Sequence, residues 1–246
     1  MENQKFEVKK IKKEMKQFVV IGLGRFGKSL ATTLSELGNE VLAIDVNPEA
    51  VKQMEGIVSG AVVADATQDN VLHSLGVQNF DCAIICIGDN LQANILATLT
   101  CKDLGVGYVV SKARNEQSKK VLERIGADMV VFPEVYMGKK VANMLSNPSM
   151  NEIMNLSDNY KIVEIPSPDN WHDKTIIELD VRKKYKVSVI FIKRNNQVVY
   201  PQTDTILKKG DILILAGEED KLESLSNKTS DVIDVASSLQ DAFESE

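Results

Sequence analysis

Histidine is scarce in this chain, and several signatures of catalysis are missing. The 246 residues contain two histidines, and neither His73 nor His172 lies in a cluster that resembles a catalytic site. The patterns GxSxG, HExxH and CxxC do not occur. Because hydride transfer needs an acid or base held against the substrate, the sequence argues against a dehydrogenase.

Long apolar runs and a basic face are missing too. No run approaches the ~18 apolar residues that span a bilayer, and the N-terminus lacks the apolar core of a secretory signal. The chain is therefore expected in the cytoplasm. With 29 Lys and Arg against 35 Asp and Glu, the net charge is −6, so no nucleic-acid partner is expected.

Cysteine is also rare, with three residues in the whole chain. Cys82 and Cys86 stand four residues apart in DCAIICIG, a segment that we predict to be a strand, so both side chains are expected on one face. We interpret them as small buried hydrophobic residues in a reducing compartment. A zinc site is the disfavoured alternative, because partner histidines are missing.

What the sequence does contain is a glycine-rich turn in FVVIGLGRFGKSLATTL, which begins at Phe18. Three apolar residues lead into Gly22, Gly24 and Gly27 at GxGxxG spacing, and an amphipathic segment follows. This order predicts a strand, a tight turn and a helix. Gly22 permits the sharp turn, Gly24 lets the backbone approach a phosphate, and Gly27 lets helix and strand pack closely. The start of the helix favours an anion.

A second strand, VLAID, ends in Asp45, eighteen residues after Gly27. A carboxylate at that place can accept hydrogen bonds from both ribose hydroxyls of an adenosine group, and it repels a 2′-phosphate. The alternative is a structural glycine-rich turn in which Asp45 only caps the next helix. The strand before the turn and the carboxylate after it favour nucleotide binding.

Strand-like and helix-like segments alternate from Gln17 to Phe132, which predicts a Rossmann-like, doubly wound parallel sheet of the α/β class. Each strand candidate is nearly all apolar, as expected when helices cover both faces. The strand candidates are 17–22, 41–45, 60–64, 81–87, 107–111 and 128–132. The helical candidates between them include 26–37, 68–75, 90–104 and 116–125.

Ligands of such sheets bind beyond the carboxyl ends of the strands, so the residues that follow each strand are site candidates. Arg25 can reach the terminal phosphate of a nucleotide held by its own or a facing subunit, and a solvent-exposed Arg is the alternative. Asp65 can accept from an adenine amino group or cap the next helix. Lys112 and Arg114 bring positive charge to the crevice or are solvated surface charges. The candidate nucleotide-binding residues are Gly22, Gly24, Arg25, Phe26, Gly27, Asp45, Asn47, Asp65, Ala66, Thr67, Gly88, Lys112 and Arg114.

Five segments are expected along the chain. Residues 1–16 are rich in lysine and form either a solvated tail or a basic arm that contacts an acidic partner or an anionic membrane surface. The nucleotide-binding domain covers 17–133, and 134–158 is a helical connector whose apolar face suits a partner helix or packs within the chain. Short strands then form a small α+β domain over 159–226. An acidic tail follows over 227–246.

Several segments together resemble the KTN/RCK family: GLGRFG, the strand end at Asp45, VADAT at 63–67, IGADMVVFPE at 125–134 and the small C-terminal module. Within that family the likeness is to the cytosolic regulatory subunits of Ktr-type potassium uptake systems, and it covers about residues 17–225. It implies an RCK N domain, a connector and an RCK C domain in a protein that is not an enzyme.

The resemblance also implies ligands and partners. ATP or ADP, or in some relatives NAD or NADH, would occupy the glycine turn, with Arg25 at the γ-phosphate across a dimer interface and Asp45 at the ribose. Glu134 would hold Mg²⁺, Ca²⁺ or Na⁺ near the phosphates. Homodimers would assemble into an octameric ring on a membrane-embedded, K⁺-translocating subunit of the KtrB/KtrD kind, at the inner face of the membrane. ATP and ADP would switch the ring.

A second, inhibitory ligand, cyclic di-AMP, is implied for the C domain, with Ile176, Val181, Arg182, Ser188 and Pro201 as candidate contacts. Aliphatic side chains would cover the bases while the guanidinium pairs the phosphate. A simple helix-end charge is the alternative role for Arg182.

Two other functions compete with this interpretation. An NAD(H)-dependent oxidoreductase is disfavoured by the missing acid/base cluster. A redox-sensing transcription regulator would need a DNA-reading helix pair and a basic face, and residues 1–16 are too short to supply them.

Overall fold

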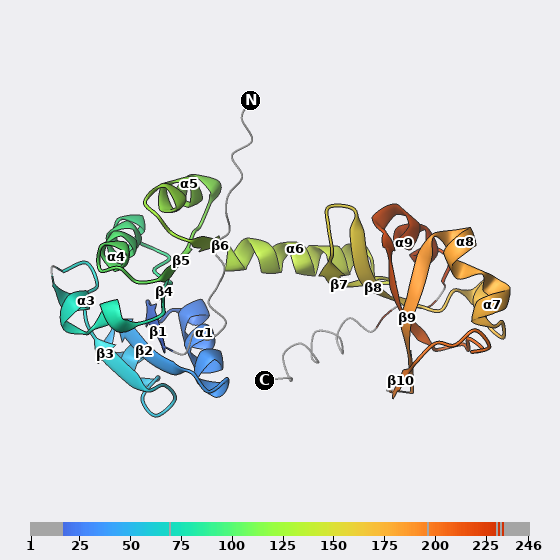
Figure 1. Cartoon of the computed structure of the whole chain (residues 1–246), viewed down its shortest axis with the longest axis horizontal. Helices are drawn as coiled ribbons and strands as arrows, with labels where there is room; N and C mark the ends of the chain where they lie inside the picture. The colour runs from blue at the N-terminus through green and yellow to red at the C-terminus, as the bar shows by residue number, and fades with distance from the viewer. Residues whose placement is uncertain (1–16, 69, 196, 230, 232, 234–246) are drawn as a thin grey trace. The chain divides into compact units, whose positions relative to one another are not determined.

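The computed structural model describes residues 17–68, 70–195, 197–229, 231 and 233, so the predicted basic tail and the end of the predicted acidic tail lie outside the described residues. The chain divides into two compact units between Tyr136 and Met137. Each unit contains its own sheet (Figure 1). Among the described residues, no helix combines the length and the apolar character that crossing a bilayer requires.

The first unit contains a six-stranded sheet in the order β3-β2-β1-β4-β5-β6, and every neighbouring pair is parallel. This topology confirms the predicted doubly wound fold, because the chain proceeds outward from β1 to β3 and then returns to β4 on the other side of β1. The strands are β1 (Gln17–Ile21), β2 (Glu40–Asp45), β3 (Gly60–Val63), β4 (Cys82–Ile85), β5 (Tyr108–Lys112) and β6 (Met129–Val131).

Helices cover both faces of this sheet, which explains why its strands are apolar on both sides (Figure 1). Val20 packs in one core with residues of α1 and α2, whereas Val19 and Ile21 pack in the other core with residues of α3 and α4. The helices are α1 (Arg25–Glu36), α2 (Pro48–Lys52), α3 (Val71–Ser74), the 3-10 helix η1 (Val77–Asn79), α4 (Leu91–Asp103) and α5 (Glu116–Arg124).

Local sequence signals set several helix starts. Asn90 Oδ1 accepts a hydrogen bond from Ala93 N at 3.0 Å, and Asn115 Oδ1 accepts one from Ser118 N at 2.8 Å. Each bond satisfies a first-turn N–H that has no acceptor within its own helix. Helix α3 is shorter than the predicted 68–75, because Asn70 adopts a left-handed conformation with φ 62° immediately before it.

The three cysteines are free and buried, which confirms the prediction for Cys82 and Cys86. Cys82 and Cys86 belong to the core under α1 and α2, and Cys101 belongs to the core on the opposite face. Burial raises the pKa of each thiol to about 12. In the described part of the chain, no group of three or more His, Cys, Asp or Glu side chains could hold a metal ion.

The second unit contains a five-stranded antiparallel sheet in the order β10-β9-β11-β8-β7. Its core gathers around Trp171 with Ile165, Ile192, Leu213 and Leu222. The strands are β7 (Asn151–Asn155), β8 (Tyr160–Pro166), β9 (Val187–Arg194), β10 (Gln197–Val199) and β11 (Ile212–Glu218). The helices are the 3-10 helix η2 (Asp169–Trp171), α7 (Ile176–Leu179), α8 (Val181–Tyr185) and α9 (Glu219–Ser226).

The predicted helical connector over 134–158 is only partly helical. Helix α6 (Pro133–Ser146) occupies its first part, but β7 pairs with β8 and belongs to the second sheet. A hairpin closes between these strands, with Leu156 N donating to Tyr160 O at 2.8 Å. The pairing partner lies outside the segment, which is why local periodicity could not reveal the strand.

The segment TIIELDVRKKY contains two short helices and not one continuous helix. Thr175 and Glu178 form a capping box that starts α7, and Asp180 then adopts a left-handed conformation with φ 44° that ends it. Helix α8 begins at the next residue.

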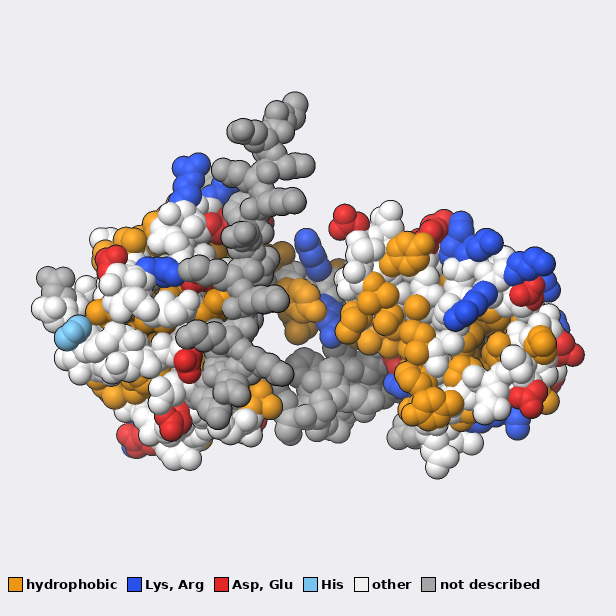
Figure 2. All heavy atoms as spheres, viewed as in Figure 1, with side chains coloured by type: hydrophobic (Ala, Val, Ile, Leu, Met, Phe, Trp, Pro, Cys, Tyr) orange, Lys and Arg blue, Asp and Glu red, His pale blue; other side chains and the backbone are white. Residues whose placement is uncertain are grey.

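Figure 2 shows hydrophobic side chains gathered on the visible face of the second unit. The exposed large hydrophobic residues of this unit include Met154, Tyr160, Val198 and Tyr200.

Candidate functional site

A pocket of about 480 Å³ lies at the carboxyl ends of β1 to β4. This is the edge at which ligands bind in doubly wound sheets. Eight of the thirteen predicted residues line it: Gly22, Gly24, Asp45, Asn47, Asp65, Ala66, Thr67 and Gly88. The lining does not include the other five, which are Arg25, Phe26, Gly27, Lys112 and Arg114.

The three glycines of the turn have different roles. Gly22 has φ +99°, and a Cβ there would lie 2.9 Å from Ile87 N. A Cβ on Gly27 would lie 2.0 Å from the carbonyl oxygen of Gly22. A Cβ on Gly24, in contrast, would meet no protein atom within 4 Å. The fold therefore requires glycine at 22 and 27, whereas Gly24 leaves open space at the start of α1.

The segment GLGRFGKS at 22–29 also matches the P-loop pattern GxxxxGK[ST], in which the lysine, here Lys28, contacts phosphates. In the structure, Lys28 Nζ donates to Gln53 Oε1, just after α2, and Lys28 does not line the pocket. The close approach of Gly27 to Gly22 is the helix–strand packing of a dinucleotide-binding turn. The geometry favours the Rossmann interpretation over a P-loop.

Asp45 joins the end of β2 to the glycine turn. Its Oδ2 accepts from Leu23 N at 2.5 Å, and its Oδ1 accepts from Asn47 N at 2.8 Å. Each carboxylate oxygen has two lone pairs, so one per oxygen is left for the hydroxyls of a ligand. Asn47 uses its own Oδ1 to cap α2, accepting from Glu49 N at 2.9 Å. Both residues are held in place before any ligand arrives.

Asp65 has a structural role of its own. Its Oδ1 accepts from Thr67 N at 2.9 Å and from Thr67 Oγ1 at 2.7 Å, and its Oδ2 accepts from Gln68 Nε2 at 3.2 Å. The hydrogen bond from the Thr67 hydroxyl is the largest cause that lowers the pKa of Asp65. Of the two predicted roles, the structure favours capping, and the capped segment is a turn ahead of α3.

The basic candidates lie around the rim of the pocket. Arg25 is exposed at the first position of α1, and Arg114 Nη1 lies 3.7 Å from Asp89 Oδ1 at the surface. Lys112 is less accessible, with 13% of its side chain exposed, and its Nζ lies 2.5 Å from Glu134 Oε1. The predicted cation ligand Glu134 is therefore paired with a lysine.

Sequence reasoning missed Asn94, which is 1% exposed on α4. Its Nδ2 donates to Ile87 O at 2.8 Å and to Lys112 O at 3.0 Å, so one side chain joins the ends of β4 and β5. The available signal was a lone amide in the apolar segment ANILATLT. The lining of the pocket also includes Asp89 and Asn90, in the segment between β4 and α4.

The second unit brings some of its candidate residues together. Arg182 Nε donates to Ser188 Oγ at 3.2 Å, while Val181 is buried in the core. Ile176 packs against that core, and its N donates to Thr205 O at 3.1 Å. Pro201 lies on the same loop as Thr205, after β10. The structure thus joins α7 to the loop that carries Pro201.

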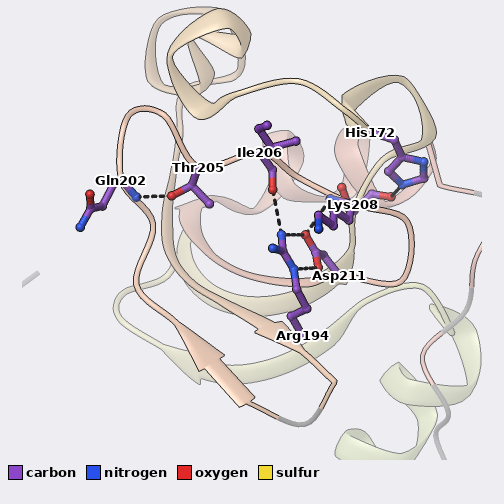
Figure 3. A network of polar contacts seen from close by, with 8 residues as sticks. His172, Arg194, Gln202, Thr205, Ile206, Lys208 and Asp211 are labelled. Carbon is purple, nitrogen blue, oxygen red and sulfur yellow. Dashed lines mark hydrogen bonds and ion pairs between the residues drawn. The ribbon is translucent and has the colours of Figure 1, made fainter.

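An ion pair between the partly buried Arg194 and the buried Asp211 holds this loop to the sheet (Figure 3). Arg194 makes two bonds of 2.7 Å to Asp211, which is 1% exposed, and a third of 2.8 Å to Ile206 O. Asp211 Oδ2 also accepts from Lys208 N at 2.8 Å. Every oxygen of this buried carboxylate is thereby hydrogen-bonded, which offsets its loss of hydration.

Comparison with known proteins agrees with both units. The TrkA-N domain model matches residues 18–133, and the TrkA-C domain model matches residues 161–230. Ktr system potassium uptake protein C of Bacillus subtilis is 41% identical over 82% of this chain and 92% of its own length. The chain belongs to the KTN/RCK family. Ktr system potassium uptake protein A of Bacillus subtilis is also 41% identical, over 87% of this chain and 96% of its own.

Among solved structures, the GsuK RCK domain matches this KTN/RCK chain with a TM-score of 0.60 and 19% identity, over 92% of this chain and 50% of the other. That likeness supports the fold alone. Both Bacillus subtilis relatives of this KTN/RCK member are potassium uptake proteins, so the chain is grouped with transport proteins and not with dehydrogenases. This confirms the prediction that the chain is not an enzyme.

Proposed function

We propose that this chain is the nucleotide-sensing regulatory subunit of a potassium uptake system. The observation that carries the proposal is Gly24, which lines a Rossmann pocket and leaves open space where a side chain would stand. What distinguishes this space is its place at the start of α1, where the first N–H groups of the helix are suited to a phosphate. The 41% identity to two Ktr potassium uptake proteins supports the transport role.

The ligand that best suits the pocket is ATP or ADP, with NAD or NADH as the alternative. Asp45 would accept from ribose hydroxyls with the lone pairs that its bonds to Leu23 N and Asn47 N leave, and the first-turn N–H groups of α1 are suited to phosphates. A nucleotide can switch the protein only through contacts that differ between its two states. Because ATP and ADP differ by one phosphate, cationic groups at the rim such as Arg25 would supply that difference, at about 1–3 kcal/mol per site.

The assembly belongs to the same proposal. Homodimers would form an octameric ring at the inner face of the membrane, docked on a K⁺-translocating subunit of the KtrB/KtrD kind. The exposed apolar residues of both units, including Leu91, Leu145 and Tyr200, supply surface that association could bury. Mg²⁺, Ca²⁺ or Na⁺ near the phosphates would require Glu134 to exchange Lys112 for the ion.

Cyclic di-AMP at the second unit is a further part of the proposal, as an inhibitory ligand. The exposed Arg182 guanidinium, fixed by Ser188, is suited to a phosphate, and Ile176 offers apolar surface for a base. The ion pair of Arg194 with Asp211 would fix the loop that contributes Pro201.

The test is a calorimetric binding panel with ATP, ADP, NADH and cyclic di-AMP. Gly24→Ser should abolish nucleotide binding at the first unit and leave cyclic di-AMP binding unchanged. Gly138→Ser is the matched control, because a Cβ there also meets no atom within 4 Å but lies on α6 outside the pocket. Arg182→Ala should weaken cyclic di-AMP alone.

The transport role is tested by expressing the chain with a Ktr-type membrane subunit in a bacterium that lacks K⁺ uptake. Gly24→Ser should remove the nucleotide dependence of K⁺ influx. Nucleotide binding that survives Gly24→Ser, or steady turnover of NADH with a carbonyl substrate, would contradict the proposal.

A further inference from the structure

Helix α6 exposes an apolar stripe in the part that belongs to the second unit. Met137, Val141 and Leu145 recur at intervals of four residues, so they lie along one side of the helix. Met137 is 42% exposed and Leu145 is 71% exposed. Neighbouring apolar side chains that are exposed on one helix face indicate a surface for another segment or partner.

The charge of this part of α6 is positive. Lys139 and Lys140 are both exposed, and residues 137–146 contain no Asp or Glu. Complementary charge favours the right partner and disfavours a wrong one. A segment that suits this face should therefore combine apolar side chains at helical spacing with negative charge.

The last described residue of the chain lies next to the end of this helix. Ile233 is 6% exposed, and its N donates to Pro148 O at 2.9 Å. Pro148 comes shortly after Ser146, the last residue of α6. The residues that follow Ile233, 234–246, therefore start beside the C-terminal end of α6.

The sequence of 234–246 has both of the required properties. Val235, Leu239 and Phe243 recur at intervals of four residues, the same spacing as in the stripe on α6. The segment contains four Asp or Glu and no Lys or Arg. As a helix it would span about 20 Å, and residues 137–146 span about 15 Å, at 1.5 Å per residue. The segment is thus long enough to run back along this part of α6.

We propose that residues 234–246 dock on the apolar stripe of α6 in the same chain, antiparallel to the helix. Carboxylates of the segment then lie near Lys139 and Lys140. The inference goes beyond the proposed function, because it needs no nucleotide. Copies of the chain can associate through this face only after the segment has left it. The antiparallel order pairs Val235 with Leu145, Leu239 with Val141, and Phe243 with Met137.

The test measures how fast a disulfide forms in the full chain between Val235→Cys and Leu145→Cys in a mild oxidant. The three native cysteines are buried and do not compete. Asn143→Cys is the matched control for Leu145→Cys, because it is also exposed but lies on the opposite side of α6. The variant with Leu145→Cys should react about tenfold faster than the control, since docking raises the effective concentration of the two thiols.

A second pair repeats the comparison at the other end of the stripe. Phe243→Cys should react faster with Met137→Cys than with Lys139→Cys, which lies on the opposite side of the helix. This pair keeps the test decisive if one of the first variants does not fold. Equal rates on the two sides of α6 would overturn the inference.

Two substitutions in the segment separate docking from simple proximity. Leu239→Asp places a charge in the apolar stripe of the segment and should slow the reaction at Leu145→Cys to the rate of the control. Ser237→Asp adds the same charge on the polar side and should leave the rate unchanged. An equal effect of both substitutions would contradict docking through the apolar stripe.

The last measurement identifies the chain to which the docked segment belongs. Isotopically labelled and unlabelled chains are mixed before oxidation, and mass spectrometry of the disulfide-linked peptides shows whether each bond joins one chain or two. Bonds within one chain are expected. Bonds that form only between chains would overturn the inference and assign this face of α6 to a second copy.

Discussion

In the first unit, the residues around the pocket follow adjacent parallel strands, whereas the candidate residues of the second unit come from two short helices, a strand and a loop. The first arrangement depends on backbone geometry, above all the close contact between Gly27 and Gly22. The second depends on side chains, above all the pair of Arg194 and Asp211. The two units should therefore fail in different ways when they are mutated.

Loss of the pair of Arg194 and Asp211 is expected to have the largest effect. Asp211→Asn leaves the partly exposed Arg194 without its counter-ion, which should destabilise the second unit by about 3 kcal/mol. The fluorescence of Trp171, the single tryptophan and fully buried in the core of this unit, reports the transition in urea. Lys221→Met, which breaks an exposed pair with Asp220, should change the midpoint little. Equal effects of the two substitutions would show that the pair of Arg194 and Asp211 contributes no more than an exposed pair.

Gly27→Ala is expected to destabilise the first unit by about 3 kcal/mol, because the added Cβ would lie 2.0 Å from a backbone oxygen. Gly24→Ala should leave stability within about 0.5 kcal/mol, since the site is open and its φ of −67° suits alanine. Circular dichroism in urea measures both. Only Gly24→Ala should produce a folded protein that has lost nucleotide affinity. A large loss of stability in Gly24→Ala would show that this glycine is structural.

Asn94→Ala should cost about 2 kcal/mol, because two carbonyl oxygens at the ends of β4 and β5 lose their donor. Nucleotide affinity should fall as well, since the residues after β4 line the pocket. Asn39→Ala removes a single side-chain bond to Leu34 O, away from the pocket, and should change stability less and affinity not at all. An unchanged nucleotide affinity in Asn94→Ala would show that the Asn94 amide does not contribute to the nucleotide site.

The smallest effect concerns Asp65. The hydrogen bonds from Thr67 lower its pKa in the folded protein from the usual value of an aspartate, so the stabilisation that it supplies is present above the unfolded pKa and is lost as pH falls through the folded pKa. Asp65→Asn should therefore lower stability slightly at neutral pH, and it should reduce the loss of stability that occurs as the pH falls. Urea midpoints between pH 3 and 7 test this, with the exposed Asp103→Asn as control. The plots of urea midpoint against pH should differ in slope between the two variants only in the acidic part of this range.

The fold of the first unit could be predicted because its signals are local. Apolar strands alternate with helices, and the parallel topology brings the residues after β1 to β4 to one edge. Eight of the predicted residues consequently meet in one pocket. The pairing of Lys112 with Glu134 could not be foreseen, because it depends on the approach of α6 to β5, which no local pattern encodes.

The second unit was harder to predict for the same reason. Strand β7 exists only through its pairing with β8, and the break at Asp180 depends on one left-handed residue in a segment with helical periodicity. Ser188 and Arg182 could be proposed as neighbours only through the family resemblance. In a small antiparallel unit, the contacts that fix a loop join residues far apart in the sequence, so local patterns do not predict them.

The buried cysteines have a practical consequence for measuring how the two units move. Thiolate is the form that reacts with alkylating labels, and thiols with a pKa of about 12 that are also covered by the core offer almost none. A cysteine introduced at an exposed position in each unit would thus be labelled in the presence of all three native ones. Pairs of spin labels or fluorophores could then record the distance between the units with and without each nucleotide, in the otherwise unaltered chain.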